Sequence, residues 1–214
     1  LSVQVEEVFY SAMEDFKMEV VVGQGSTARS VSIPLEPFTL VGATTKLSSL
    51  SRPFLSRFGI QERMEFYSQD SLFRIILRSA DLLDIKIDKD GAMELAQRSR
   101  GTPRIANRLL KRVWDFSVVM GREYITKDIV EHALLRLDID AKGLDRTDRI
   151  ILKTLWEQYG GGPVGIDALS VTMGEEKLTL EEVYEPFLIH SGLISRGPRG
   201  RVITEAGKAQ IRCI

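Results

Sequence analysis

Residues 101–113 read GTPRIANRLLKRV and contain the clearest helix start in the sequence. Thr102 suits the N-cap position, and Pro103 suits the first helical position because its missing N–H would be unpaired there in any case. The pattern predicts a helix whose buried face carries the apolar residues at three- and four-residue spacing, namely Ile105, Leu109, Val113 and Phe116.

Arg104 lies in the first turn of this predicted helix. The free amide groups and the dipole of a helix N-terminus attract anions, and a guanidinium group at the same place adds positive charge. The sequence therefore indicates Arg104 as a candidate phosphate-binding residue. Because arginines are mostly exposed, a plain surface position is the alternative that the local sequence leaves open.

The sequence around this helix, from residue 67 to residue 142, is predicted to be helical almost throughout. Further start signals occur at Asp70, at Asp88 or Asp90, and at Thr126. Four short helices joined by short loops predict a small helical bundle.

Residues 143–214 follow another pattern, with three helices and then a hairpin. Glycines 160–162 separate the first two predicted helices, and Thr179 with Glu182 is typical of a capping box at the start of the third. Two short apolar runs in residues 193–204 predict the hairpin strands. Three helices followed by a hairpin indicate a winged helix-turn-helix.

The tip of this hairpin is basic. Arg196, Arg199 and Arg201 lie around the turn Gly197-Pro198, where no bulky apolar group keeps a duplex away. Contact with DNA phosphates is the expected use, and a solvated hairpin tip is the alternative. Three phosphate contacts give a log–log salt slope of only about −2.7, which predicts weak binding without sequence preference.

The first part of the chain, residues 1–66, has the pattern of an α/β domain. We expect a helix at 5–16, a hairpin at 18–33, and a strand at 38–43 that is apolar on both faces and hence covered on both sides. The polar residues Thr44-Thr45-Lys46 follow this strand. Because ligands of open α/β sheets bind at the carboxyl ends of strands, these residues are site candidates.

Arg57 lies in the sequence PFLSRFGI, between aromatic residues and shortly after the candidate strand. An arginine there can stack on its aromatic neighbours, or it can reach across a subunit boundary to a transferring phosphoryl group. Sequence position alone leaves both interpretations open.

Composition narrows the class of protein. The 29 Lys and Arg against 30 Asp and Glu give a net charge of −1, so nucleic-acid contact requires a local basic cluster. One cysteine, Cys213, excludes an internal disulfide, and one cysteine with two histidines argues against a zinc site. A reducing cytoplasm is therefore expected. No apolar run reaches the roughly 18 residues of a membrane span, so no membrane association is expected.

The sequence contains no GKS or GKT phosphate loop and no apolar strand that ends in adjacent acids. This chain alone is therefore not expected to hold and hydrolyse a nucleotide. It also opens at Leu1 in the middle of a pattern, without methionine, and we interpret it as a fragment.

Seven strings spread over nearly the whole sequence resemble the RuvB family, the bacterial motors of the AAA+ class that drive branch migration of Holliday junctions. In order, they are EEVFYSAMEDF, PFTLVGATTK, PFLSRFGI, RSRGTPRIANRLLKRV, GGGPVGIDAL, YEPFLIHSGLI and SRGPRGR. The resemblance implies a multidomain fold, α/β plus all-α: the carboxyl-terminal part of an AAA+ P-loop sheet domain (1–66), a four-helix lid (67–142) and a winged helix (143–214).

The resemblance also implies a function. Members form hexameric ATPases that encircle duplex DNA in the bacterial cytoplasm and act with RuvA and with the nuclease RuvC. ATP and Mg²⁺ are the implied cofactors, bound mainly by residues expected upstream of Leu1, and no metal ligand is expected in this chain. The hairpin Val20–Ile33 matches the region that touches RuvA.

Individual residues match nucleotide-site positions of the family. Thr45 matches the sensor-one residue that positions the attacking water, Arg57 matches the arginine finger that acts on the neighbouring subunit, and Arg104 matches sensor two. The remaining nucleotide-proximal positions are Glu14, Asp15, Phe16 and Tyr67.

The wing residues that contact DNA in the family correspond to Arg196 and Arg201, with Arg199 between them. Three positions depart from the family pattern: Phe16 lacks a phenol oxygen, Lys46 replaces a common arginine, and Leu55 replaces an arginine found in many members. The second hypothesis is a non-catalytic winged-helix DNA-binding module, or a truncated subunit without activity.

Overall fold

The computed structural model describes residues 3–22 and 29–212, which divide into two compact units, Leu1–Met64 and Glu65–Ile214. The elements of the first unit are α1 (Val3–Asp15), β1 (Lys17–Val22), β2 (Arg29–Pro34), η2 (Leu47–Ser49) and α2 (Arg52–Leu55). None of the described helices combines the length and apolar character that a membrane span requires.

The first unit is held by the contact of α1 with α2. Phe54 is buried, and its ring lies against the rings of Phe9 and Tyr10, with centroids 6.0 and 6.3 Å away. Ser51 caps α2 by accepting a hydrogen bond from the Phe54 amide. The buried Glu6 carboxylate in turn accepts the Ser51 amide hydrogen at 3.4 Å. These contacts place the segment that follows α2 beside α1.

The predicted helix and hairpin of this unit are confirmed. Strands β1 and β2 pair antiparallel, with Lys17 opposite Pro34 and Val22 opposite Arg29. The predicted hairpin tip, residues 23–28, lies outside the described residues.

The predicted buried strand at 38–43 is wrong for this structure. These residues form no ladder with another strand, and Val41 is 86 % exposed. A strand needs partner strands for its backbone groups, and the only ladder of the described residues in this unit is the β1–β2 hairpin. Thr44 and Thr45 therefore stand on exposed, irregular chain rather than at the end of a parallel strand.

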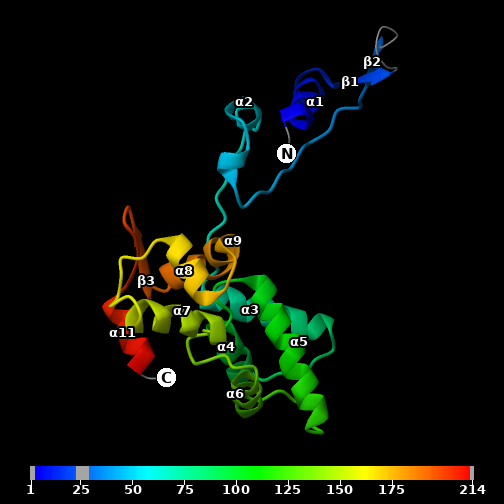
Figure 1. Cartoon of the computed structure of the whole chain (residues 1–214). Helices are drawn as coiled ribbons and strands as arrows, with labels where there is room; N and C mark the ends of the chain where they lie inside the picture. Colours follow the sequence, from blue (N-terminus) through cyan, green and yellow to red (C-terminus); the bar gives the residue numbers. More distant parts are fainter. Residues whose placement is uncertain (1–2, 23–28, 213–214) are drawn as a thin grey trace. The chain divides into compact units, whose positions relative to one another are not determined.

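The second unit begins with the helical bundle, which we define as helices α3 to α6. They are α3 (Gln69–Leu82), α4 (Lys89–Gln97), α5 (Pro103–Val119) and α6 (Lys127–Arg136), and Figure 1 shows them gathered together. The four predicted helices are thus confirmed. Their shared core is aliphatic and includes Leu72, Ile76, Leu95, Leu110, Val113, Val130 and Leu134.

Most helix starts of the bundle follow the predicted signals. Asp88 caps α4 through the Gly91 amide, and Thr102 precedes Pro103 at the start of α5. The prediction of Asp70 as the cap of α3 is wrong, because Ser68 Oγ accepts the Ser71 amide hydrogen at 3.2 Å.

The rest of the second unit is the winged-helix module, which we define as α7 to α11 with β3 and β4. Its elements are α7 (Arg146–Glu157), α8 (Ile166–Met173), α9 (Lys177–Thr179), the π-helical turn η3 (Leu180–Tyr184), α10 (Glu185–His190), β3 (Ile194–Gly197), β4 (Gly200–Ile203) and α11 (Glu205–Arg212). Its separate core includes Leu144, Ile151, Leu152, Leu155, Leu169, Leu180 and Leu188.

The predicted capping box at Thr179 and Glu182 is wrong. The chain is already helical from Lys177, so both residues lie within the continuous turn of α9 and η3. A capping box occurs instead at α7, where Asp145 and Asp148 each accept the other's amide hydrogen at 3.0 Å.

Glycines allow the wing to pack closely on the segment before α8. Val164 and Arg201 exchange two backbone hydrogen bonds of 2.9 and 2.8 Å. Gly200 has φ +127° and faces the Val164 carbonyl oxygen, leaving no room for a Cβ atom. The turn end of strand β4 therefore has Val164 as a further backbone partner, in addition to β3.

Arg100 joins the helical bundle to the winged-helix module. Its Nη2 atom lies 2.5 Å from Asp148 Oδ2 and 2.9 Å from Asp145 Oδ2. Its Nε donates to the Gly143 carbonyl at 2.7 Å, and its Cζ lies 4.8 Å from the ring centroid of Phe187. We call this set the Arg100 junction. The Arg100 side chain thus contacts four residues that lie in the winged-helix module or directly before it.

The Arg100 junction perturbs Asp148, which is fully buried. Burial raises the pKa of Asp148, Arg100 lowers it, and the neighbouring Asp145 raises it, with a net value of about 6 against 3.8 ordinarily. Since the folded protein binds this proton more tightly than the unfolded chain, the contribution of Asp148 to the free energy of unfolding falls as pH rises from about 4 to about 6.

The substitution Asp148→Asn tests this sign. Asparagine does not titrate, so the free energy of unfolding of the variant should rise relative to the parent by roughly 1–3 kcal/mol between pH 4.5 and pH 7.5. Urea unfolding followed by tryptophan fluorescence reports on the second unit, because both tryptophans, Trp114 and Trp156, lie in it.

The matched control is Asp167→Asn. Asp167 is an exposed carboxylate whose pKa is lowered by a hydrogen bond from Lys177, so its stabilisation is present at neutral pH and is lost on acidification. The control variant should not gain stability relative to the parent as pH rises. A difference between Asp148→Asn and the parent that stays constant or falls over this range contradicts the buried-carboxylate account.

Candidate functional site

Arg57 is held inside the first unit by three groups. Its Nη2 lies 3.0 Å from Glu14 Oε1, and its Nη1 donates to the Pro53 carbonyl at 2.7 Å. Its Cζ lies 4.1 Å above the ring of Tyr10. The side chain keeps 22 % of its surface exposed, and its buried Nε has no partner among the described atoms. The guanidinium is thus held in one orientation by these partners.

The structure brings together Arg57 and Glu14, two residues that the sequence indicated separately. The other predicted positions of this unit lie apart from that pair. Asp15 and Thr45 are exposed, and Phe16, with φ +52°, ends α1 and turns its ring edge-on to Phe38 at 5.9 Å. Neither the pairing with Glu14 nor the stacking on Tyr10 was predicted, although Tyr10 lies in the same motif of α1 as Glu14.

Arg104 and Tyr67 belong to the second unit and lie near the start of α5. Arg104 is exposed in the first turn of α5, and no described side chain forms an ion pair with it. The Tyr67 amide donates to the Gly101 carbonyl at 2.8 Å, which ties the start of the bundle to the loop before α5. The Tyr67 side chain is 42 % exposed. This end of α5 therefore presents a free cation, free amides and an aromatic ring to solvent.

The three wing arginines differ in environment. Arg199 is exposed at the turn, and Arg196, 54 % exposed, lies 3.4 Å from Glu181 and 3.5 Å from Glu185. Arg201 is buried, with Nε donating to Glu185 and Nη2 lying 3.0 Å from both Glu185 and Glu181.

Burial lowers the pKa of Arg201, but the hydrogen bonds and charges of Glu185 and Glu181 raise it by more, so the net shift of the Arg201 pKa is upward. The predicted phosphate contact of Arg201 stays a prediction. In this structure its guanidinium group binds the two glutamates instead. A cation and an anion that are both nearly inaccessible form a strong anchor when each has several partners. Arg201 thereby fixes β4 of the wing to α10.

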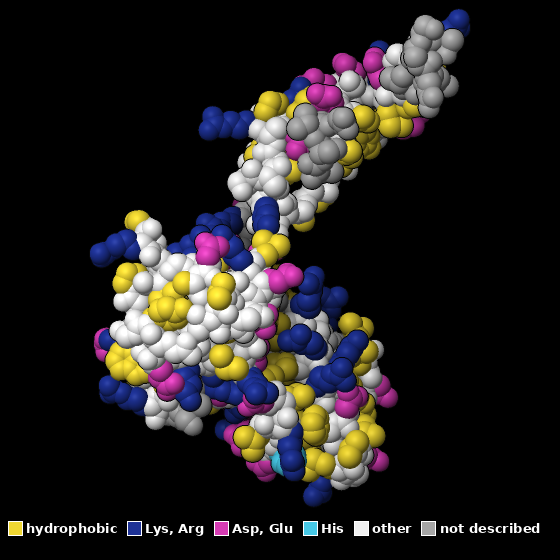
Figure 2. Space-filling view, viewed as in Figure 1, with side chains coloured by type: hydrophobic (Ala, Val, Ile, Leu, Met, Phe, Trp, Pro, Cys, Tyr) yellow, Lys and Arg dark blue, Asp and Glu magenta, His cyan; other side chains and the backbone are white. Residues whose placement is uncertain are grey.

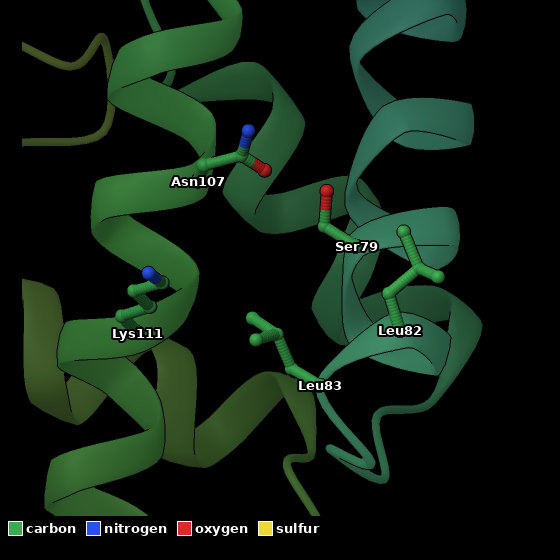
Figure 3. A pocket seen from close by; sticks show the side chains of 5 residues that line it. All are labelled: Ser79, Leu82, Leu83, Asn107 and Lys111. Carbon is green, nitrogen blue, oxygen red and sulfur yellow. The ribbon is translucent and has the colours of Figure 1, made fainter.

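Two hollows lie on the helical bundle. The first, shown in Figure 3, is an open depression of about 230 Å³ between α3 and α5, lined by Ser79, Leu82, Leu83, Asn107 and Lys111. The buried Asn107 Oδ1 accepts no hydrogen bond there from the described residues. The second, also about 230 Å³, lies where α5 approaches the start of the winged-helix module. Four arginines line it, and no sequence pattern indicated that they would meet.

No group of three or more His, Cys, Asp and Glu side chains in residues 3–22 and 29–212 is placed to hold a metal ion. Glu181 and Glu185 instead form ion pairs with Arg196 and Arg201 of the wing. We therefore derive no catalytic step through a metal ion from these residues.

Family-specific sequence models match the chain in three consecutive parts. The Holliday junction DNA helicase RuvB P-loop domain matches residues 1–64, the RuvB AAA lid domain matches residues 67–140, and the RuvB C-terminal winged helix domain matches residues 141–212. Together they account for nearly the whole chain.

Curated relatives agree with these models. The Holliday junction branch migration complex subunit RuvB of Bdellovibrio bacteriovorus is 54 % identical over 211 residues, which are 99 % of this chain and 64 % of the relative. The subunit of the same description from Lactobacillus gasseri is 53 % identical over 99 % of this chain and 62 % of its own length. The chain thus spans less than two thirds of these relatives.

Solved structures of Thermotoga maritima RuvB are similar in fold. The Holliday junction branch migration motor superposes with a TM-score of 0.85 at 47 % identity, covering 99 % of this chain and 66 % of that one. Its P216G mutant gives a TM-score of 0.86 at 46 % identity, with 99 % and 67 % covered. With three RuvB domain models matched in order and relatives above 50 % identity along its whole length, the chain belongs to the RuvB family.

Proposed function

We propose that this chain forms part of a subunit of a hexameric, ATP-driven motor that moves Holliday junctions along DNA. The domains are 1–66, 67–142 and 143–214. The proposal includes ATP and Mg²⁺ as cofactors, RuvA as a partner at the hairpin Val20–Ile33, RuvC as the nuclease that follows, and the bacterial cytoplasm as the location. The printed names of the relatives, which refer to a branch migration complex, support the junction as substrate.

The observation that carries the proposal is that the wing is anchored to the module while two of its arginines stay exposed. Arg196 and Arg199 are exposed on a hairpin whose second strand is anchored by Arg201 and by backbone bonds to Val164. An anchored hairpin with exposed cationic side chains can contact the phosphates of a duplex without reading bases. That behaviour suits a motor that has to act on any sequence.

The charge of the third helical segment supports this mode of contact. In many winged helix-turn-helix proteins the corresponding helix enters the major groove. Here that segment carries Glu181, Glu182 and Glu185, two of which pair with wing arginines. Carboxylates facing a duplex are repelled by its phosphates. The wing is therefore the proposed DNA-contacting element, and the glutamates orient it.

Residues of the nucleotide site are proposed from both units. Arg104 offers a free guanidinium at a helix N-terminus, where a phosphate group is favoured by charge and by the amides. Tyr67 lies beside the same loop. Arg57, which contacts Glu14 and Tyr10, is the residue proposed to act on the neighbouring subunit. Thr45, Asp15 and Phe16 complete the proposed set. When bound, ATP supplies the free energy of phosphoryl transfer that moves DNA.

The wing is tested with the double variant Arg196→Ala/Arg199→Ala. Its affinity for a short duplex should fall, and the log–log salt slope should shrink by about 1.8, because each lost phosphate contact contributes about 0.9. Arg122→Ala, an exposed arginine between α5 and α6, is the matched control and should keep both values. Equal slopes for the double variant and the control, measured by fluorescence anisotropy, contradict the wing contact.

The motor itself is tested in assemblies of full-length subunits that contain this sequence. Arg57→Ala should lower the turnover of ATP by roughly 10³- to 10⁵-fold and leave ATP binding intact, since an arginine finger acts on the transition state. Mixing these subunits with subunits that lack the phosphate-loop lysine should restore part of the activity, because each kind completes the other's site. Mixtures that recover no activity contradict action between subunits.

A further inference from the structure

The second hollow of the bundle is a basic cavity that the proposed motor function does not use. It has a volume of about 230 Å³ and lies between α5 and the chain that leads into α7. We call it the arginine cavity, and its lining residues are Arg98, Arg100, Ile105, Arg108, Leu109, Arg112, Leu137, Ile139, Gly143 and Asp145. In Figure 2, Lys and Arg side chains gather over the bundle along the hollow next to the winged-helix module.

Two of the four arginines are fixed and neutralised. Arg98 bonds Glu94 through Nε at 2.8 Å and Nη2 at 2.5 Å, with both side chains almost buried. Arg100 is paired with Asp148 and Asp145 in the Arg100 junction. These two side chains form a preorganised wall whose guanidinium planes cannot rotate freely.

The other two arginines are not compensated in the same way. No described side chain pairs with Arg108, which is exposed one turn after Arg104 on α5. Arg112 reaches only Asp115, at 3.3 Å, and both side chains are more than half exposed, so that pair contributes little. Two weakly compensated cations thus line a cavity whose other two arginines are already paired with carboxylates. Their mutual repulsion is relieved by an anion.

The apolar residues of the cavity strengthen the electrostatic attraction between its arginines and an anion. Leu109 is buried, and Ile105, Leu137 and Ile139 are packed against the bundle core. A wall of low polarity screens charges less than water does, so an anion held there interacts more strongly with the guanidinium groups than it would on an open surface.

We propose that the arginine cavity binds phosphate groups. The planar guanidinium fork matches phosphate oxygens, and the two forks that largely buried carboxylates do not occupy, those of Arg108 and Arg112, both line this cavity. The volume is smaller than the roughly 300–1,000 Å³ of sites for drug-sized ligands, which favours one or two phosphate groups over a whole nucleotide or a peptide segment. The source is a small polyphosphate or the backbone of a nucleic acid, and a phosphate bound there bridges α5 and the Arg100 junction.

Pyrophosphate is the probe. In calorimetric titrations of the full chain with sodium pyrophosphate at constant ionic strength, we expect saturable binding that weakens at least tenfold in the double variant Arg108→Ala/Arg112→Ala. Both side chains are exposed, so the variant should fold, and circular dichroism checks this. Arg78→Ala, an exposed arginine on α3 outside the cavity, is the matched control and should bind as the parent does.

A second titration, in the presence of a short DNA duplex and in the Arg196→Ala/Arg199→Ala background, identifies the source. Competition assigns the site to a nucleic-acid backbone, and undiminished pyrophosphate binding assigns it to a small polyphosphate. Equal affinity of the Arg108/Arg112 variant and the control overturns the proposal, as does binding that is lost only with Arg104→Ala. The assay needs no ATP hydrolysis, so its outcome is independent of the motor function.

Discussion

The ion pair of Arg100 with Asp148 is the constraint on which the arrangement of the second unit depends. It joins residues 48 positions apart. Arg100 lies just before α5 and Asp148 in the first turn of α7, so the pair connects the starts of these two helices. Arg100 adopts φ +52° and Gly143 φ +79° to let the chain segments meet. Such conformations persist only where surrounding contacts stabilise them, and a fully buried carboxylate needs its cation. The Arg100 junction therefore links the bundle to the winged-helix module.

A second ion pair, between Arg201 and Glu185, anchors the wing. Glu185 lies on the same module as the partners of Arg100, and it binds Arg201 on strand β4 of the wing. One ion pair thus links Arg100 next to the bundle with Asp148 of the module, and a second links Arg201 of the wing with Glu185 of α10. Of the three wing arginines that the sequence indicates for DNA contact, Arg201 thus anchors the wing, and Arg196 and Arg199 stay exposed.

Local signals in the sequence predicted much of this fold. The four bundle helices, the start of α5 at Thr102-Pro103 and the wing hairpin depend on short-range periodicity and capping. The strand at 38–43 could not be predicted correctly, because a strand forms only against partner strands. Spacing also could not reveal that Arg201 would be buried, that Arg57 would meet Glu14, or that Asp148 would pair with Arg100, since those contacts depend on how distant helices pack.

The most direct test of the central claim is the distance between the bundle and the winged-helix module with and without Arg100. Spin labels at Arg136→Cys on α6 and Val171→Cys on α8, both exposed, in a Cys213→Ser background, report this distance by pulsed electron resonance. The account predicts a single narrow distance distribution that broadens when Arg100→Gln is added. A distribution that is equally narrow without Arg100, or already broad with it, contradicts the claim that this ion pair holds the two parts together.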